Sequence, residues 1–128
     1  MFLKMKALNT TNAPAAIGPY SQTIEANGTV YVSGQLPINP ATGEFAEGGI
    51  QAEARQSLTN IQNILATEGL TMQNVVKVTV LLADIGNFAA VNEVYAEFFK
   101  APYPARSAFA VAALPKGANI EIKAIAVK

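Results

Sequence analysis

An amphipathic helical stripe in the middle of the chain constrains its fold more than any other feature. Between residues 50 and 65, apolar residues recur at intervals of four, four, three and four, at Ile50, Ala54, Leu58, Ile61 and Leu65. This spacing places the five side chains on one side of a helix, which must then be buried against another layer. Gly69 follows at the position where a left-handed residue commonly ends a helix.

Runs of β-branched and apolar residues predict strands on both sides of this helix. Asn27-Gly28 separates two of them and is the strongest short signal for a two-residue hairpin. The run 75–82 is too apolar and β-branched for an exposed loop, so we expect a central strand there. The predicted strands are, in chain order, Lys4–Leu8, Thr23–Ala26, Thr29–Ser33, Val75–Leu82, Ser107–Ala112 and Ile120–Val127.

Proline, glycine and asparagine mark the connections between these elements. Residues 12–19 and 37–49 are predicted loops, and the second contains a turn at residues 39–43. A second helix is expected after Asn87, which can cap it. The predicted inner face of this helix carries Phe88, Val91, Tyr95 and Phe98.

The element order is βββαβαββ, which predicts an α+β fold. We expect both helices to pack on one face of a mixed six-stranded sheet. No linker, repeat or low-complexity segment divides the chain, so residues 1–128 are predicted to form a single domain.

The other face of such a sheet needs cover, and the composition suggests that further copies of the chain supply it. Hydrophobic residues make up 51% of the sequence and charged residues only 14%, against about 25% charged residues in a typical soluble domain. We interpret this bias as burial of part of the surface between copies. A simply apolar monomer is the alternative.

The residue types that are missing exclude several classes of function. Because the sequence has no histidine and no cysteine, Ser-His-Asp catalysis, HExxH zinc sites, disulfides and thiolate nucleophiles are excluded. Nine basic and nine acidic residues cancel, which leaves no basic footprint for nucleic acid. No segment approaches the ~18 apolar residues of a membrane span, and Met1–Lys6 holds no signal-peptide core. We therefore expect a cytoplasmic protein without metal, cofactor, membrane or nucleic-acid partner.

Two charged residues on predicted strands are candidates for catalysis. Arg106 follows Pro104 at the mouth of a strand, and its planar fork of donors suits a small carboxylate. A surface salt bridge is the alternative role for this arginine. Glu121 shares one strand face with Lys123. A carboxylate facing a partly apolar cleft there could have a raised pKa and activate water; a solvated strand face is the alternative.

Three polar residues are candidates for lining a site. Asn92 falls on the inner side of the second predicted helix, so its amide lies near the core or, with equal weight, at an exposed boundary. Tyr20 and Ser33 offer hydroxyls from a loop and a strand, where they could also satisfy nearby backbone groups. By contrast, we interpret Asp84 as a strand-end turn residue and Arg55 as a polar helix position.

Short motifs are spread over nearly the whole chain, from about residue 12 to residue 127. They are Gly18-Pro19-Tyr20-Ser21-Gln22, Ser33-Gly34-Gln35-Leu36-Pro37, Asn39-Pro40, Thr42-Gly43, Pro104-Ala105-Arg106-Ser107, Leu114-Pro115-Lys116-Gly117 and Ile120-Glu121-Ile122. In this order, and taken as a set, they resemble the RidA (YjgF) family. Any one of the motifs alone would be a weak signal.

This resemblance implies a chorismate-mutase-like fold and a homotrimer with a cleft at each subunit interface. The implied activity is hydrolytic deamination of 2-iminobutanoate and 2-iminopropanoate to 2-keto acids and ammonia. By the same resemblance, Arg106 is the carboxylate clamp and Glu121 is the activator of water. Tyr20, Ser33 and Asn92 then line the substrate site.

The sequence departs from the resemblance at Ala108. Many members carry a cysteine two residues after the arginine, so thiol chemistry is ruled out here, and Ala108 would serve the substrate site through backbone groups. One alternative function is a trimer that binds or senses 2-keto acids or other small carboxylates without turnover. Another is a ribonuclease or translation inhibitor, against which zero net charge and the absence of a basic stretch argue.

Overall fold

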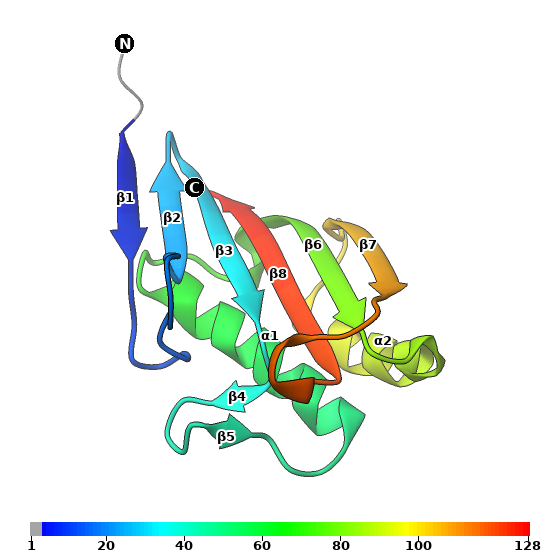
Figure 1. Ribbon diagram of the computed structural model, residues 1–128. Coiled ribbons are helices and arrows are strands. Elements are labelled where there is room, and N and C mark those ends of the chain that lie inside the picture. The colour runs from blue at the N-terminus through cyan, green and yellow to red at the C-terminus, as the bar shows by residue number, and fades with distance from the viewer. Residues whose placement is uncertain (1–3) are drawn as a thin grey trace.

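One large sheet with two helices on the same face forms the framework of the protein (Figure 1). The computed structural model describes residues 4–128. Met1–Leu3 lie outside the described residues, although they belong to the predicted domain and to the segment for which no signal-peptide core is expected. The helices are α1 (Ile50–Ala66) and α2 (Phe88–Phe98). The strands are β1 (Met5–Leu8), β2 (Thr23–Ala26), β3 (Thr29–Gln35), β4 (Ile38–Asn39), β5 (Glu44–Phe45), β6 (Val75–Leu82), β7 (Ala105–Ala110) and β8 (Ile120–Val127).

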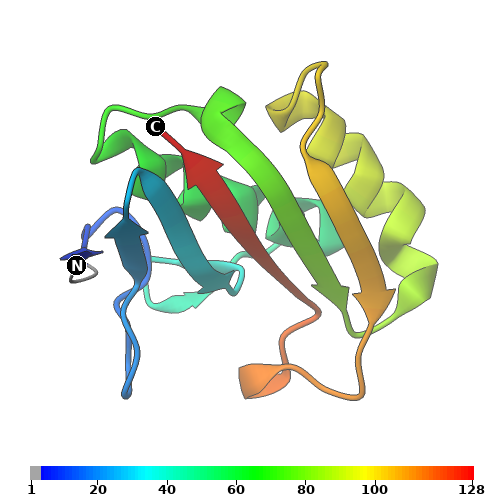
Figure 2. The same cartoon turned by 90° about the horizontal axis from the view of Figure 1, so that it is seen from above.

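The large sheet has six strands in the order β1-β2-β3-β8-β6-β7. Its neighbouring strands are antiparallel except β6 and β7, which are parallel and are connected through α2. In Figure 2 both helices lie behind the strands and leave the opposite face without a helix. The predicted α+β arrangement of two helices on a mixed six-stranded sheet is therefore confirmed.

The hydrophobic core fills the space between the helices and the sheet. Alternate residues of the central strand β8 face it, since Ile120 and Ile122 are fully buried while Lys123 is exposed. The apolar stripe predicted for α1 is also there: Ile50 is partly buried, and the residues exposed by 1% or less are Ala54, Leu58, Ile61 and Leu65.

Gly69 ends α1 in the predicted way. Its φ of 70° lies in the left-handed region, and its N–H donates to the Ala66 carbonyl at 3.0 Å. The next N–H, that of Leu70, donates to the Leu65 carbonyl at 3.0 Å. These two bonds form a Schellman motif, which satisfies carbonyls at the helix end and turns the chain toward β6.

The predicted hairpin is confirmed, and the long loop after it holds a small sheet that was not predicted. Asn27 and Gly28 have φ values of 52° and 82°, as a type I′ turn requires. Within residues 37–49, β4 and β5 pair across a turn in which the Gly43 N–H donates to the Asn39 carbonyl at 2.8 Å. Two-residue strands are too short for an alternating pattern, so the sequence shows only their turn.

The predicted capping role of Asn87 is wrong, although α2 does begin at the next residue. Asn87 has helical dihedrals (φ −84°, ψ −3°) and its side chain makes no capping bond, whereas a capping residue needs extended backbone. Asp84 takes this role instead, because its backbone is extended and its Oδ1 accepts the Gly86 N–H at 2.8 Å. The chain thereby enters α2 through a short 3₁₀ turn, Ile85–Asn87.

The predicted strand Ser107–Ala112 is shifted by two residues. Strand β7 runs from Ala105 to Ala110, because these are the residues that pair with Lys77–Leu82 of β6. Arg106 is consequently the second residue of a paired strand and does not precede it. Its side chain therefore has a direction set by the sheet.

The second face of the sheet carries exposed apolar side chains. Tyr31 is 47% exposed, Phe109 47% and Val127 42%. Tyr31 and Val127 alternate with buried residues along β3 and β8. Phe109 of β7 pairs with Leu81, which also pairs with Glu121, so it lies on the same face. We call this surface, which no helix covers, the open face of the sheet.

Candidate active site

Arg106 lies on the helix side of the sheet, where α2 crosses β7. It pairs with Val78, which is fully buried against the helices, and paired residues of parallel strands share a face. The guanidinium Nη1 donates to Asn92 Oδ1 at 2.7 Å. The guanidinium carbon also lies 5.2 Å from the ring centroid of Phe88 and 4.6 Å from that of Tyr95.

The three partners of Arg106 come from one side of α2, since Phe88, Asn92 and Tyr95 are spaced by four and three residues. A cation over an aromatic face is attracted by the negative face of the ring. Two rings and one amide therefore fix the direction of a guanidinium that itself remains exposed. The sequence predicts Phe88 and Tyr95 only as inner-face residues of this helix. Their spacing around Asn92 is the signal from which their contact with Arg106 could have been inferred.

A cleft of about 420 Å³ opens beside this arginine. Its lining residues are Asn92, Tyr95, Ala96, Tyr103, Pro104 and Arg106. Asn92 is exposed at the cleft, so the expectation that its amide lies near the core is wrong and the exposed alternative holds. The amide oxygen finds its partner in Arg106 because both side chains project into the same cleft.

Tyr95 is the buried wall of the cleft. It is 6% exposed, and its ring contacts that of Phe99 at a centroid distance of 4.5 Å. Burial raises the pKa of its phenol, and the Arg106 charge opposes this rise. Within residues 4–128 the phenol oxygen has no hydrogen-bond partner. Tyr95 is therefore a neutral aromatic support for the guanidinium.

Glu121 lies on the open face. It pairs with Leu81 of β6 and alternates with the buried Ile120 and Ile122 along β8. The side chain is half-buried, and this burial raises the pKa of its carboxyl, while the charge of Lys123 lowers it by a smaller amount. A carboxyl whose pKa is raised is a stronger base than an ordinary glutamate, which suits it to accept and return protons.

A β-bulge in β3 faces Glu121. Val32 pairs with Ala124 and Gln35 with Ile122, so Ser33 and Gly34 together oppose the single residue Lys123. The Ser33 hydroxyl donates to the Ser21 carbonyl at 2.6 Å. Gly34 lies directly against the Glu121 side chain, whose carboxyl carbon is 2.6 Å from the position that a Cβ on residue 34 would occupy.

Tyr20 lies in the loop before β2, which is bonded to the bulge through Ser21. It is 54% exposed, and its hydroxyl accepts the Ile17 N–H at 3.4 Å. Ser21, the next residue in the loop, accepts the hydrogen bond from Ser33 and so holds the loop against β3. Tyr20 is thus linked to the bulge through the backbone of its neighbour Ser21 rather than through its own side chain. We refer to Tyr20, Ser33 and Glu121 together as the open-face group.

The predicted site residues thus fall into two groups on opposite sides of the sheet. Arg106 and Asn92 form the cleft group beside α2. Ala108 follows Arg106 on the same face of β7 but packs against the core and does not line the cleft. One copy of the chain brings Arg106 against Asn92 and the β3 bulge against Glu121, but it does not bring the two groups together.

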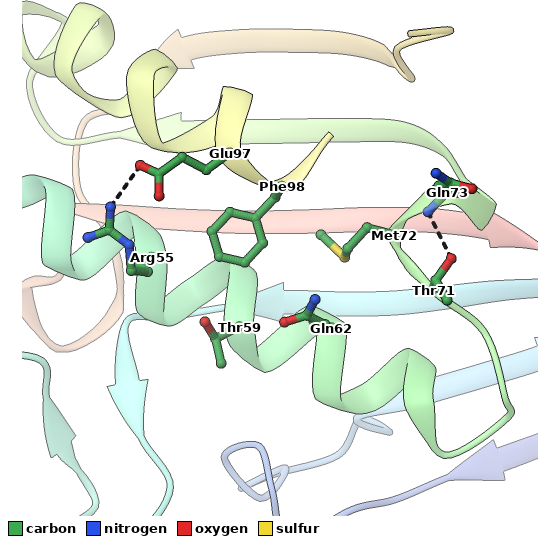
Figure 3. A pocket seen from close by; sticks show the side chains of 8 residues that line it. All are labelled: Arg55, Thr59, Gln62, Thr71, Met72, Gln73, Glu97 and Phe98. Atoms are coloured by element: carbon green, nitrogen blue, oxygen red, sulfur yellow. Dashed lines mark hydrogen bonds and ion pairs between the residues drawn. The ribbon is translucent and has the colours of Figure 1, made fainter. Parts of the chain in front are cut away.

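A second, larger groove lies between the two helices, away from every predicted site residue (Figure 3). Its volume is about 610 Å³ and its lining residues are Arg55, Thr59, Gln62, Thr71, Met72, Gln73, Glu97 and Phe98. An exposed ion pair of 2.8 Å between Arg55 and Glu97 crosses one end. Arg55 is thereby the structural helix residue that the sequence suggested.

Residues 4–128 contain no group of three or more His, Cys, Asp and Glu side chains placed to hold a metal ion. No helix in this described stretch combines the length and the hydrophobicity needed to cross a bilayer.

Comparison with known proteins extends over almost the whole chain. The 2-iminobutanoate/2-iminopropanoate deaminase of Capra hircus is 54% identical over 126 residues, which cover 98% of this chain and 92% of the goat protein. A solved structure from Yersinia pestis, described as a member of the conserved Rid protein family, has a TM-score of 0.94 and 48% identity and covers 98% of this chain and 100% of that one. The structure of Escherichia coli TdcF with bound serine has a TM-score of 0.91 and 44% identity and covers 96% and 98%.

A sequence model of the family described as Endoribonuclease L-PSP matches residues 10–128. Together with the relatives above, this match assigns the fold and the motifs to one known family. The chain belongs to the Endoribonuclease L-PSP family, which is the RidA (YjgF) family.

Proposed function

We propose that this protein is a 2-iminobutanoate/2-iminopropanoate deaminase, which hydrolyses reactive 2-imino acids to 2-keto acids and ammonia. The goat relative with this name is 54% identical to the chain. The observation that carries the proposal is the exposed guanidinium of Arg106, held in a fixed direction in a cleft by Asn92 and two aromatic rings. Such a guanidinium binds a small carboxylate through two parallel hydrogen bonds.

The proposed reaction needs positioning and one proton acceptor. Arg106 holds the substrate carboxylate, which leaves the neighbouring C=N carbon open to attack. Glu121 accepts a proton from water as the water oxygen bonds to the carbon of the protonated C=N group; the π electrons move to nitrogen and a neutral carbinolamine forms. The same carboxyl then returns this proton to the nitrogen and takes the hydroxyl proton as the C=O bond forms and the C–N bond breaks. Ammonia leaves and carries the second proton away as ammonium. Water supplies the oxygen atom and two hydrogens, so no oxidant or reductant is required.

The proposal places the reaction between two copies of the chain. Since Arg106 and Glu121 lie on opposite faces of one sheet, a single copy cannot present both to one small substrate. A homotrimer solves this problem if the open face of each copy meets the cleft of the next. The exposed Tyr31, Phe109 and Val127 on that face support such burial.

The remaining roles follow from this arrangement. Tyr20 and Ser33 approach the substrate from the copy that supplies Glu121, and Asn92 from the copy that supplies Arg106. The substrate site extends in this proposal to the backbone of Ala108, two residues after Arg106 on β7, although the Ala108 side chain packs against the core. We propose a cytoplasmic enzyme without cofactor, acting on free imino acids, with neither nucleic acid nor membrane as partner. The zero net charge of the chain supports the absence of an RNA substrate.

The test is an assay of 2-keto acid and ammonia release from imines generated in place by an amino-acid oxidase. Spontaneous hydrolysis is subtracted, and several amino acids are compared. Wild-type protein should accelerate hydrolysis, while Arg106→Ala should lose about 3 kcal/mol of transition-state binding, roughly a hundredfold in kcat/KM. Arg55→Ala, at the other arginine of the chain, is the control and should keep wild-type activity.

One outcome would contradict the activity and another the role of Arg106. If wild-type protein does not exceed spontaneous hydrolysis for any imine, the protein is not a deaminase. Saturable binding of 2-keto acids without turnover would then identify a carboxylate-binding trimer. If hydrolysis is accelerated but Arg106→Ala is unaffected, the carboxylate clamp is wrong even though the activity stands.

A further inference from the structure

We propose that Gly34 is a positioning residue for Glu121: the absence of a side chain at residue 34 creates the space in which the Glu121 carboxyl is held. This inference rests on the proposed function, because it assigns the geometry of the group that is to activate water. It goes beyond the proposed function because it assigns a role to Gly34, which has no side chain and is not among the residues of the proposed reaction.

The contact between the two residues is unusually close. A Cβ built on Gly34 would lie 2.6 Å from the Glu121 carboxyl carbon, 2.6 Å from Oε2 and 3.0 Å from Cγ. All three distances are below normal van der Waals separation, so the carboxyl occupies the volume that any other residue would fill. Gly34 is in this respect unlike Gly28 and Gly117, where a Cβ would meet no atom within 4 Å.

Backbone strain does not explain a glycine at this position. Gly34 is absent from the residues with a left-handed φ, in contrast to Gly18 and Gly43. An alanine could therefore adopt the same backbone conformation. The closest atoms that a Cβ would meet here all belong to the Glu121 side chain.

The β-bulge explains why residue 34 faces Glu121 at all. In a regular strand, neighbouring residues point to opposite faces. Here Val32 and Gln35 both face the core, so the intervening Ser33 and Gly34 both lie toward the open face. The extra residue in the bulge thus places Gly34 beside Glu121 on the open face. The Glu121 carboxyl occupies the space that a side chain at residue 34 would take.

An alanine at this position is expected to leave the fold intact and to move the carboxyl. The colliding atoms belong to the far end of a flexible side chain, which can rotate away at little cost compared with a shift of backbone. The new methyl group would therefore displace Glu121 into another rotamer. A base displaced by about 1 Å loses its alignment with the attacking water.

The experiment compares Gly34→Ala, Glu121→Gln and the double variant in the imine hydrolysis assay. Gly34→Ala should lower kcat about tenfold or more and change KM by less than about twofold, because the base and not the carboxylate clamp is disturbed. In the Glu121→Gln background the same substitution should cause no further loss, since two residues that act through one group are not additive. Gly86→Ala is the matched control: this glycine also lacks a left-handed φ, and its Cβ would lie 3.1 Å from Asp84 Oδ1. It introduces a tight methyl–carboxylate contact away from Glu121 and should retain wild-type kcat.

Crystal structures of wild type and Gly34→Ala provide a readout that does not depend on activity. The proposal predicts an unchanged backbone and a Glu121 carboxyl moved away from residue 34. An unmoved carboxyl, or an equal loss of kcat in the presence and absence of the Glu121 carboxylate, would overturn it. A wild-type protein without hydrolysis would contradict the proposed function, and the crystal structures would still decide whether Gly34 positions Glu121.

Discussion

Arg106 and Glu121 lie on opposite faces of the same β-sheet. Arg106 pairs with Val78 on the side that α2 covers, and Glu121 pairs with Leu81 on the side that no helix covers. The two charges that the proposed reaction needs are thus separated by the sheet within one copy. The proposed reaction therefore depends on contacts between copies of the chain.

Asn92 should direct Arg106 without competing for the substrate. Its neutral amide accepts one hydrogen bond from Nη1 at 2.7 Å and leaves the positive charge available. In Asn92→Asp a carboxylate would pair with the guanidinium in place of the substrate, so KM should rise about tenfold, equivalent to about 1.4 kcal/mol. Asn92→Ala should raise KM less, and initial rates over a range of imine concentrations measure both. An equal or smaller effect of the aspartate would contradict this role.

Tyr95 should act through its ring and not through its hydroxyl. Tyr95→Phe keeps the ring under Arg106 and removes a buried hydroxyl without a partner among the described residues, so KM should be unchanged and the free energy of unfolding equal or higher. Tyr95→Leu removes the ring and should raise KM about threefold, from the loss of roughly 0.5–1 kcal/mol of cation–π attraction.

Phe99→Leu is the matched control for the Tyr95 series. Phe99 contacts the Tyr95 ring and is equally buried, but it is not among the aromatic partners of Arg106. This variant should lose stability and keep its KM. If Phe99→Leu raises KM as much as Tyr95→Leu does, Tyr95 contributes only to packing.

The rate should fall on the acid side at a pH above the ordinary range of a glutamate. Burial raises the pKa of Glu121, and a base must be unprotonated, so kcat falls as the pH drops through that raised pKa. The charge of Lys123 lowers the same pKa. Lys123→Met should therefore move the acid limb of the pH–rate profile to higher pH, and Lys123→Arg should leave it in place. A limb that moves to lower pH in Lys123→Met would contradict the role of Glu121.

Asn60 should matter for stability and not for chemistry. Its fully buried amide donates to the Ile38 carbonyl at 3.0 Å and so ties α1 to the β4–β5 hairpin. Asn60→Ala leaves the part-buried Leu36 and Ile38 carbonyls without this donor and should cost about 2–3 kcal/mol in urea unfolding. Asn63→Ala, in the same helix but with an exposed bond to the Asn12 carbonyl, should cost less than about 1 kcal/mol. Equal losses would show that burial of the amide is not the cause.

The local elements could be predicted because their signals are local. The period of α1, its glycine end and the Asn27-Gly28 turn depend on residues close in sequence, and the structure confirms all three. The capping prediction at Asn87 failed because Asp84, three residues earlier, satisfies the same requirement.

The arrangement of the candidate site could not be predicted, because it depends on pairing between distant strands. The face on which Arg106 lies is set by the register of β7 against β6, and a shift of one residue would reverse it. The bulge that places Gly34 against Glu121 likewise exists only through the pairing of β3 with β8. Periodicity within one segment carries no information on either contact.

The most direct test of the central claim is complementation between two inactive variants. Chains with Arg106→Ala and chains with Glu121→Gln are expressed together with different affinity tags, and sequential purification on both tags isolates mixed oligomers. Each parent alone should be nearly inactive in the imine assay. In a mixed trimer, one of the three interfaces joins an intact Arg106 to an intact Glu121, so activity should recover to about a third of the wild-type value. Mixed oligomers as inactive as their parents, or no mixed oligomers at all, would contradict a site assembled from opposite faces of two sheets.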